Sequence, residues 1–370
     1  MLDQTPRRRA AVEAQARANG TDAILIGPGA NLEYLTGYRG SITTERLTCL
    51  VLVPGREPLM FAPLLEQPLV EWALQDGADL SVVTWADGDD WLDGLISLLP
   101  ATPRRIAVDA QMWFDRWSAV KRRLPMAEIV SAGPVMSRLR SAKTLAEIAA
   151  LEQAGAAIDT VHANMAHWLR AGRREREVGA DVAAAILAAG HQTVEFVIVA
   201  AGPNSASPHA EVTDRVIQPG EPVVVDIGGR MPSGYNSDCT RTYLIGEPSE
   251  DFARLYDVLE SAQQVQCAMI RPGVLPEDID AAGRAIITEA GFGPQFMHRT
   301  GHGIGLETHE APYIVRGCRT PLAAGATFSI EPGIYRPHVG GARIEDIVVC
   351  ETGGARRLNH GPRKLRLLDH

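Results

Sequence analysis

The chain has 370 residues, of which 45% are hydrophobic and 22% are charged, so it is long enough for two domains that each bury a core. Its 45 acidic residues outnumber its 36 basic ones and give a net charge of -9, which argues against a nucleic-acid partner, because such a surface needs clustered positive charge. No apolar run approaches the roughly 18 residues of a membrane-spanning helix, so we expect no membrane partner either.

The N-terminus and the cysteines both bear on where the protein is located. The N-terminus, MLDQTPRRRAAVEAQARANG, has positive charge but no apolar segment after it, which is not typical of a secretory signal. The five cysteines are scattered and form no CxxC pair: Cys49, Cys239, Cys267, Cys318 and Cys350. This pattern is typical of reduced thiols, so we predict a cytoplasmic protein.

Short apolar runs alternate with amphipathic stretches over residues 1–135. Turn residues and apolar spacing predict helices over residues 10–20, 71–77 and 91–100. Runs rich in β-branched and aliphatic residues predict strands over residues 22–27, 47–55, 58–63 and 105–110. Strands that alternate with helices indicate a small α/β domain.

A long amphipathic helix is predicted to open a second domain. Thr144 and Glu147 have the spacing of a capping box. Apolar residues follow at steps of three and four, at Ile148, Leu151, Ala154, Ile158, Val161, Met165 and Trp168. We therefore place the boundary near residue 136 and expect domains at 1–135 and 136–370.

The second domain contains an internal similarity. Residues 170–190 and 271–291 align without gaps at a constant offset, 271 − 170 = 101, and both segments share an RxG start and an AG end. The period is too long for a solenoid, so we infer a duplicated half-domain of two helices followed by strands. A site between two such halves would take residues from both.

Five residues beside β-type apolar runs have metal-binding side chains: Asp226, Asp238, His302, Glu331 and Glu345. Asp226 ends the run VVVD, where a buried carboxylate is costly unless something pairs with it. Asp238 follows twelve residues later, and this step across a hairpin can bring both side chains to one face. Singly, each is more often a capping, loop or solvent-facing residue, but the set in this order predicts a metal site.

Four carboxylates with one imidazole suit two divalent ions bridged by carboxylates. One nitrogen and no thiolate favour Mn(II) or Co(II), with Fe(II) or Zn(II) as further options. Two such ions, roughly 3.5–4 Å apart, can hold a bridging hydroxide and polarise a carbonyl oxygen. The residues alone therefore predict hydrolysis at a pair of metal ions.

Three further histidines, His209, His298 and His309, lie near these segments. Imidazoles beside a dinuclear site can donate hydrogen bonds to a developing oxyanion or move protons, and otherwise they have structural roles. Arg343 lies two residues before Glu345, on the same strand face, where it could brace a metal-binding carboxylate. Its alternative is an ordinary surface arginine.

Taken together, GPNSASPH, VVVDIGG, NSDCTRT, GHGIGLETHE, EPGIY and RIED resemble the motifs of the pita-bread metallopeptidases, in the prolidase and Xaa-Pro aminopeptidase branch. The segment NLEYLTGY (31–38) resembles the N-terminal domain of the same branch. The resemblance implies an α+β fold, with a pita-bread C-terminal domain of two pseudo-symmetric halves behind a smaller creatinase-type α/β domain. It also implies hydrolysis of the Xaa-Pro amide bond of dipeptides or short peptides.

The resemblance also implies roles for individual residues. The five candidates match the family's metal ligands, with Asp238 and Glu345 bridging both ions, and Glu331 matches the ligand that accepts a proton from the nucleophilic water. His209 and His309 match the histidines that steady the tetrahedral intermediate and the leaving nitrogen. The remaining matches place His298 in the proline pocket and Arg343 near the metal centre.

Family members are commonly dimers, so the resemblance implies a homodimer. The N-terminal domain of one subunit would lie near the site of the other, and Tyr38 and Arg39 would be the residues that reach across to bind substrate.

One position departs from the family's pattern. Many prolidases carry an arginine four residues after the second histidine of GHGIGLETHE, where it helps to hold the terminal carboxylate of a dipeptide. Here that position is Tyr313, which we expect to contact substrate instead. Arg316 or Arg319 could replace the missing charge. The departure leaves room for peptides longer than two residues.

Other functions on the same fold stay open. Metal-free hydrolases such as creatinase lose several ligands, whereas all five are present here. A metal-dependent amidase or lyase of a small non-peptide solute would use the same ligand set. A binding module without catalysis would normally have lost ligands, and methionine aminopeptidases generally lack a domain like residues 1–135.

Overall fold

The computed structural model describes residues 4–40, 45–74 and 80–369. The chain divides into two compact units, Met1–Leu139 and Arg140–His370. The boundary expected near residue 136 lies inside α6 (Gly133–Ser141), the helix in which the first unit ends. In the described part of the chain, no helix is both long and apolar enough to span a bilayer.

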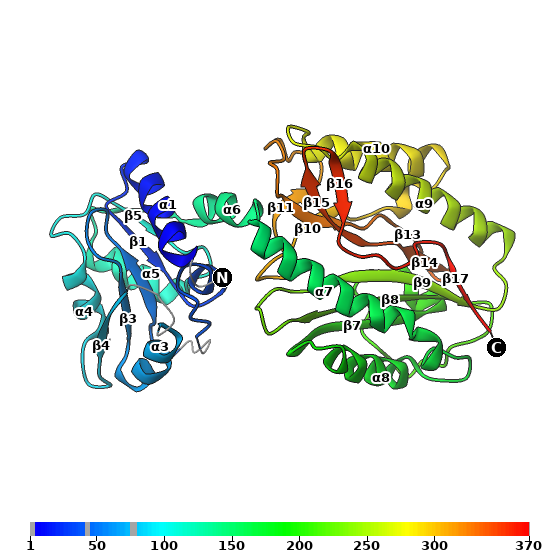
Figure 1. Ribbon diagram of the computed structural model, residues 1–370, viewed down its shortest axis with the longest axis horizontal. Helices are drawn as coiled ribbons and strands as arrows, with labels where there is room; N and C mark the ends of the chain where they lie inside the picture. The colour runs from blue at the N-terminus through cyan, green and yellow to red at the C-terminus, as the bar shows by residue number, and fades with distance from the viewer. Residues whose placement is uncertain (1–3, 41–44, 75–79, 370) are drawn as a thin grey trace. The chain divides into compact units, whose positions relative to one another are not determined.

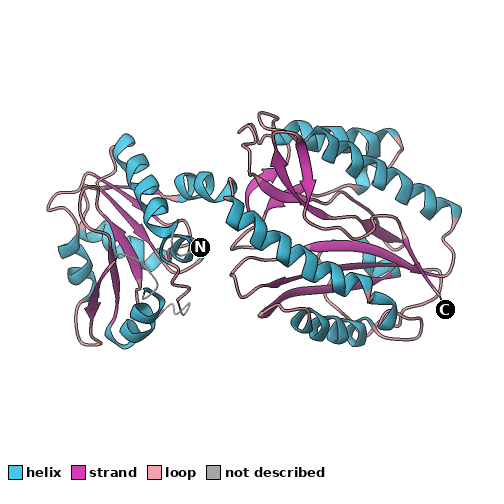
Figure 2. Cartoon of the chain, in the orientation of Figure 1, coloured by secondary structure: helices cyan, strands magenta, loops and turns pink. Residues whose placement is uncertain are grey.

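The N-terminal unit is built on a six-stranded mixed sheet (Figure 2). Its spatial order is β4-β3-β2-β1-β5-β6, with β1 antiparallel to β2 and parallel to β5. The strands are β1 (Ala23–Ile26), β2 (Cys49–Leu52), β3 (Leu59–Pro63), β4 (Ser81–Trp85), β5 (Arg105–Val108) and β6 (Glu128–Ser131). The helices are α1 (Thr5–Ala18), α2 (Ala30–Thr36), α3 (Gln67–Leu74), α4 (Trp91–Leu98) and α5 (Phe114–Arg123).

The sequence predicts the four inner strands of this sheet and misses its two edges. β1 and β2 are buried at every position, which gives continuous apolar runs. β4 and β6 lie at the edges and are largely half-buried or exposed, so their sequences carry little apolar signal. Residues 75–77 of the helix expected over 71–77 lie outside the described residues.

The C-terminal unit contains four main helices and three sheets (Figure 1). The helices are α7 (Leu145–Ala163), α8 (Glu175–Ala188), α9 (Glu250–Met269) and α10 (Pro276–Glu289). The first sheet, in the order β17-β9-β8-β7, contains β7 (Thr193–Ala201), β8 (Pro222–Arg230), β9 (Cys239–Ile245) and β17 (Arg366–Leu368). The second, in the order β11-β10-β12-β15-β16, contains β10 (Gly301–Gly303), β11 (Glu310–Ile314), β12 (Thr327–Ile330), β15 (Asp346–Glu351) and β16 (Gly354–Arg357). β13 (Gly333–Arg336) and β14 (Gly340–Arg343) form a separate antiparallel pair.

Each pair of helices covers its own strands. Ile158 of α7 and Val182 of α8 share a fully buried cluster with Val225 of β8. Ile279 of α10 is buried with Phe328 of β12 in a second cluster. In Figure 1, α7 and α8 accordingly lie beside β7 and β8, whereas α9 and α10 lie together on the other side of the unit.

The internal similarity corresponds to repeated structure. α8 starts at Glu175 and ends at Ala188, and α10 starts at Pro276 and ends at Glu289, so both bounds recur at the 101-residue offset. Gly190 and Gly291, which follow the two helices, both have positive φ, at 104° and 92°. This left-handed conformation favours glycine after a helix, which explains why the residue occurs at both positions.

Helix α7, which Thr144 caps, is shorter than its apolar spacing predicts. The capping box forms as expected, with the Thr144 and Glu147 side chains bonded to each other's backbone. The helix ends at Ala163, where the Asn164 side chain donates to the carbonyl of Thr160, and a short 3-10 turn at Met165–His167 follows. Met165 in this turn and Trp168 after it continue the buried face, so periodicity alone does not reveal the change of helix type.

Candidate metal centre

The five candidate ligand residues all lie on strands or at strand ends of the C-terminal unit. Asp226 is in β8 opposite Thr240 of β9, so Asp238, two residues before Thr240, projects from the same face of the hairpin. His302 lies in β10, Glu331 directly follows β12, and Glu345 directly precedes β15. Both halves of the unit therefore contribute side chains.

These side chains converge in one cluster. The atoms that could bind a metal form three overlapping groups, and within each group they lie within 4.8 Å of one another. The three groups are Asp226 with Asp238 and Glu345, His302 with Glu331 and Glu345, and Asp238 with His302 and His309. Because the groups share members, their arrangement is the one expected for neighbouring ions with common ligands. The first two groups contain all five residues predicted from the sequence.

Protein donors hold one oxygen of each of two carboxylates and leave the other without a partner. Arg343 donates from Nη2 to Oδ2 of Asp226 at 2.5 Å, and Thr240 donates to Oε2 of Glu345 at 2.7 Å. Oδ1 of Asp226 and Oε1 of Glu345 are buried, and no hydrogen bond from the described residues reaches them. A buried carboxylate oxygen without a partner is costly, so the donor set fits cations in this place.

His302 is oriented so that one ring nitrogen faces the acids. Its Nδ1 donates to the carbonyl of Gly303 at 3.1 Å, which leaves Nε2 to point at Oε1 of Glu331, 3.1 Å away. The Ser329 hydroxyl accepts from the His302 backbone N–H and donates to the same Glu331 oxygen. A histidine held at one nitrogen presents the other in a fixed direction, as metal-binding imidazoles do.

The electrostatics of the cluster also favour a cation. Burial raises the pKa of Glu345 and Asp238 well above the usual range, and repulsion by neighbouring carboxylates adds to the shift. Burial also raises the pKa of Asp226, although Arg343 opposes the change. Burial acts in the same direction on Glu331, but His302, His298 and Arg343 together outweigh it and lower that pKa. Crowded buried acids of this kind are relieved by protons or by metal ions.

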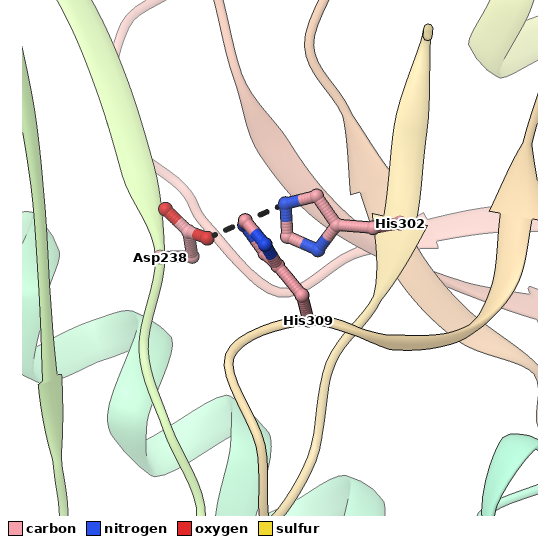
Figure 3. A group of neighbouring side chains, drawn as sticks. All are labelled: Asp238, His302 and His309. Atoms are coloured by element: carbon pink, nitrogen blue, oxygen red, sulfur yellow. Dashed lines mark ion pairs between the residues drawn. The ribbon is translucent and has the colours of Figure 1, made fainter. Parts of the chain in front are cut away.

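The cluster opens into a cavity of about 840 Å³ in the C-terminal unit, a size that suits a small peptide. His209, His298 and His309 line it together with the five candidate ligand residues. The rings of His302 and His309 are 3.9 Å apart between centroids, and Asp238, directly before β9, points toward them (Figure 3). Burial and then His302 lower the pKa of His309 to about 4, so its imidazole is neutral near pH 7.

Both ring nitrogens of His298 are already engaged. Nδ1 donates to the carbonyl of Arg299 at 2.7 Å, so Nε2 must accept from the hydroxyl of Tyr335 at 2.9 Å. The same Tyr335 oxygen accepts from Arg343, which in turn holds Asp226. Burial lowers the pKa of His298. A neutral His298 therefore presents its ring to the cavity. Hydrogen bonds through Tyr335 and Arg343 connect it to Asp226 in the acid cluster.

The remaining residues expected to contact substrate lie elsewhere. Tyr313, in β11, is 39% exposed and stacks against Arg299, but it is not among the residues that line the cavity. Tyr38 belongs to the N-terminal unit, where it is buried and donates from its hydroxyl to Glu66 at 2.9 Å. Arg39 is exposed in the same unit.

Several residues that shape the site are not predicted from the sequence. Thr240 and Ser329 hold candidate ligands, yet single hydroxyl residues in strands carry no signal of their own. Tyr335 connects His298 to Arg343 only because β13 pairs with β14. Arg299 lies within HRTGHG, three residues before His302, and that closeness is the one signal that could have identified it.

The fold and the acid cluster together define a metal-dependent hydrolase. Residues 149–352 match metallopeptidase family M24, and residues 8–142 match the creatinase/prolidase N-terminal domain. The chain is 46% identical over 364 residues to probable dipeptidase PepE of Mycobacterium tuberculosis, covering 97% of this chain and 95% of that protein. It is 32% identical over 348 residues to the Xaa-Pro dipeptidase of Pyrococcus furiosus, covering 94% and 96%. The crystal structure of dipeptidase PepE from Mycobacterium ulcerans has a TM-score of 0.95 and 44% identity, covering 100% and 99%.

The chain belongs to metallopeptidase family M24. The expected fold is confirmed: a pita-bread catalytic domain preceded by a creatinase-type N-terminal domain. The enzyme class is also confirmed as a metallopeptidase, and the family implies divalent metal ions.

Proposed function

We propose that this metallopeptidase hydrolyses the Xaa-Pro amide bond of dipeptides or short peptides. The observation that carries the proposal is the pair of unpartnered carboxylate oxygens on Asp226 and Glu345. These two residues belong to overlapping groups of possible ligands with Asp238, His302 and Glu331, beside a peptide-sized cavity. The names of the relatives support the substrate class, because they include a dipeptidase and an Xaa-Pro dipeptidase.

Two divalent ions would be held by Asp226, Asp238, His302, Glu331 and Glu345. An acid-rich set with a single imidazole favours Mn(II). When bound, such ions supply Lewis acidity toward a peptide carbonyl and lower the pKa of water. The protein's own part begins with Glu331, whose position next to His302 suits it to accept a proton from the attacking water.

The histidines and the arginine of the cavity have complementary roles in this proposal. His309 and His209 would donate hydrogen bonds to the developing oxyanion and pass a proton to the leaving nitrogen. His298 would present its ring to the substrate's proline, since both of its nitrogens are engaged. Arg343 would keep Asp226 oriented by its short hydrogen bond.

The bond that this site would cleave differs from other peptide bonds because its nitrogen belongs to proline. An Xaa-Pro bond has no N–H and its ring fixes φ, so a site that binds substrate as an extended strand cannot use its usual backbone hydrogen bonds. The cavity wall contains apolar surface from Phe196, Val197 and Ile198 besides the histidines, which suits a pyrrolidine ring.

We further propose a cytoplasmic homodimer. All five cysteines are free, which suits a reducing compartment. The N-terminal unit carries an apolar patch in which four side chains are more than half exposed: Leu64, Leu65, Leu69 and Trp72. Patches of this kind support self-association. Light scattering of the wild-type protein and of Trp72→Glu tests the dimer, because the substitution would yield monomers.

A panel of cleavage assays tests the activity, using protein from which metal has been removed with a chelator, with and without added MnCl2. The substrates are Ala-Pro, Ala-Pro-Ala and Ala-Ala. We expect Mn(II)-dependent cleavage of Ala-Pro and little cleavage of Ala-Ala. Equal cleavage of Ala-Pro and Ala-Ala would contradict the proline preference, and cleavage of none of the three would contradict the peptidase proposal and favour a small non-peptide amide as substrate.

A further inference from the structure

Arg299 brings to the cavity wall a positive charge that no acid neutralises. It lines the same cavity as the acid cluster, and in the described ranges of the chain no carboxylate lies within ion-pair distance of its guanidinium. The other arginine of the wall, Arg343, is already committed to Asp226, Thr240 and Tyr335. The cavity therefore offers one guanidinium whose hydrogen-bond donors are not used by an acid of the protein.

An aromatic ring supports this guanidinium. The central carbon of the Arg299 guanidinium lies 4.8 Å from the centroid of the Tyr313 ring. Such cation–π stacking fixes the plane of the guanidinium and leaves its N–H groups free at the edges. The backbone of Arg299 is also held, because its carbonyl accepts the bond from His298. A side chain restrained at both ends loses little entropy when it binds a ligand.

The charge also lies near the reacting centre. Arg299 lies three residues before His302 and lines the same cavity as His302 and His309, whose rings are 3.9 Å apart. In a dipeptide, the free carboxylate belongs to the residue whose nitrogen leaves, so it lies one residue from the scissile carbonyl. A cation that recognises it must share the cavity with the metal ligands, as Arg299 does.

The two arginines expected from the sequence to replace a charge at position 313 do not meet this requirement. Arg316 is exposed and is absent from the cavity wall. Arg319 is 78% exposed in its side chain and donates from Nε to Glu277 at 2.8 Å. Neither one lines the cavity, whereas Arg299 does.

We propose that Arg299, supported by the Tyr313 ring, binds the free C-terminal carboxylate of a dipeptide and so determines a preference for dipeptides over longer peptides. The inference rests on the proposed peptidase function and names the part of the substrate that the site recognises. A guanidinium matches a carboxylate with two parallel hydrogen bonds, whereas a longer peptide offers only a neutral amide at this position.

The test compares Ala-Pro with its C-terminal amide, Ala-Pro-NH2, on Mn(II)-loaded wild-type protein and Arg299→Met. We expect the wild type to favour the free acid. In Arg299→Met, KM for Ala-Pro should rise about 10- to 100-fold, the loss that one or two charge-assisted hydrogen bonds produce, while kcat/KM for the amide changes less than about twofold. Arg316→Met is the matched control, because it removes an exposed arginine outside the cavity, and it should leave both substrates unchanged.

One further variant separates recognition from folding. Arg299→Lys keeps the charge but not the paired donors, so it should recover part of the preference for the acid. Calorimetric titration with L-proline and L-prolinamide gives a readout without turnover, and only proline should bind more weakly to Arg299→Met than to the wild type.

The assignment would be overturned if Arg299→Met slowed hydrolysis of the free acid and of the amide equally. It would also be overturned if the wild-type protein cleaved both substrates equally well. In the second case the proposed peptidase function would stand. A wild type that cleaves neither substrate with Mn(II) would contradict the peptidase function, and the carboxylate site with it.

Discussion

Glu345→Gln removes one negative charge from the buried acid cluster and changes almost nothing else. Glutamine has the size of glutamate, and its side-chain oxygen can still accept the hydrogen bond from Thr240. In metal-free protein, burial makes the charge of Glu345 costly, and repulsion by Glu331 and Asp226 adds to that cost. We therefore expect this substitution to stabilise the metal-free protein, although most buried substitutions destabilise.

The size of the effect follows from the spacing of the acids. Two ionised carboxylates with oxygens about 5 Å apart repel by about 3 kcal/mol at an effective dielectric constant of about 20. The raised pKa values mean that part of this repulsion is already relieved by bound protons, and the new amide N–H₂ lacks a partner. We expect a net gain of about 1–2 kcal/mol, which corresponds to about 2–8 °C in the unfolding midpoint of a unit of this length.

The assay is thermal unfolding of the C-terminal unit at pH 8, first in EDTA and then with MnCl2. Wild-type protein should gain about 2.7 kcal/mol with the free ion at about 100 times its Kd, whereas Glu345→Gln should gain much less. Glu211→Gln is the control, because Glu211 lines the same cavity but is exposed and lies outside the cluster. A Glu345→Gln protein that is less stable than wild type in EDTA and gains equally from Mn(II) would refute the reasoning.

The other predictions concern pH, the ligands and the histidines. Folding raises the pKa of Asp226, Asp238 and Glu345, so the folded metal-free protein binds more protons than the unfolded chain. Its stability should therefore fall as pH rises from about 4 through the raised pKa values. A melting midpoint that increases from pH 5 to pH 8 in EDTA would oppose this. Asp238→Ala and Glu331→Ala should abolish hydrolysis and leave a folded protein by circular dichroism, and turnover retained by either purified variant would count against the metal assignment. His209→Ala and His309→Ala should lower kcat about 100- to 1000-fold with bound metal unchanged by mass spectrometry; loss of an ion from His309→Ala would instead make it a ligand, which its distance to Asp238 and His302 allows.

The sequence predicts features that rest on local chemistry. A single acid beside an apolar run carries little signal, but four such acids in order with His302 indicated a shared site before any geometry was known. The structure brings those five side chains together, while their role as ligands stays a prediction. The duplicated half-domain was visible for a similar reason, because glycine after a helix is required twice at the same offset.

The sequence does not predict features that depend on how distant segments pack. The edge strands β4 and β6 have few buried positions, so they lack an apolar pattern. The chain of hydrogen bonds from Asp226 through Arg343 and Tyr335 to His298 joins residues up to 117 positions apart. The stacking of Arg299 on Tyr313 likewise requires the pairing of β10 with β11, which no local pattern specifies.

Anomalous diffraction at the manganese edge, from crystals of the wild-type protein grown with MnCl2, tests the central claim most directly. We predict two neighbouring peaks in each chain, enclosed by Asp226, Asp238, His302, Glu331 and Glu345. Density for no ion among these side chains, or ions bound only elsewhere in the chain, would contradict the account.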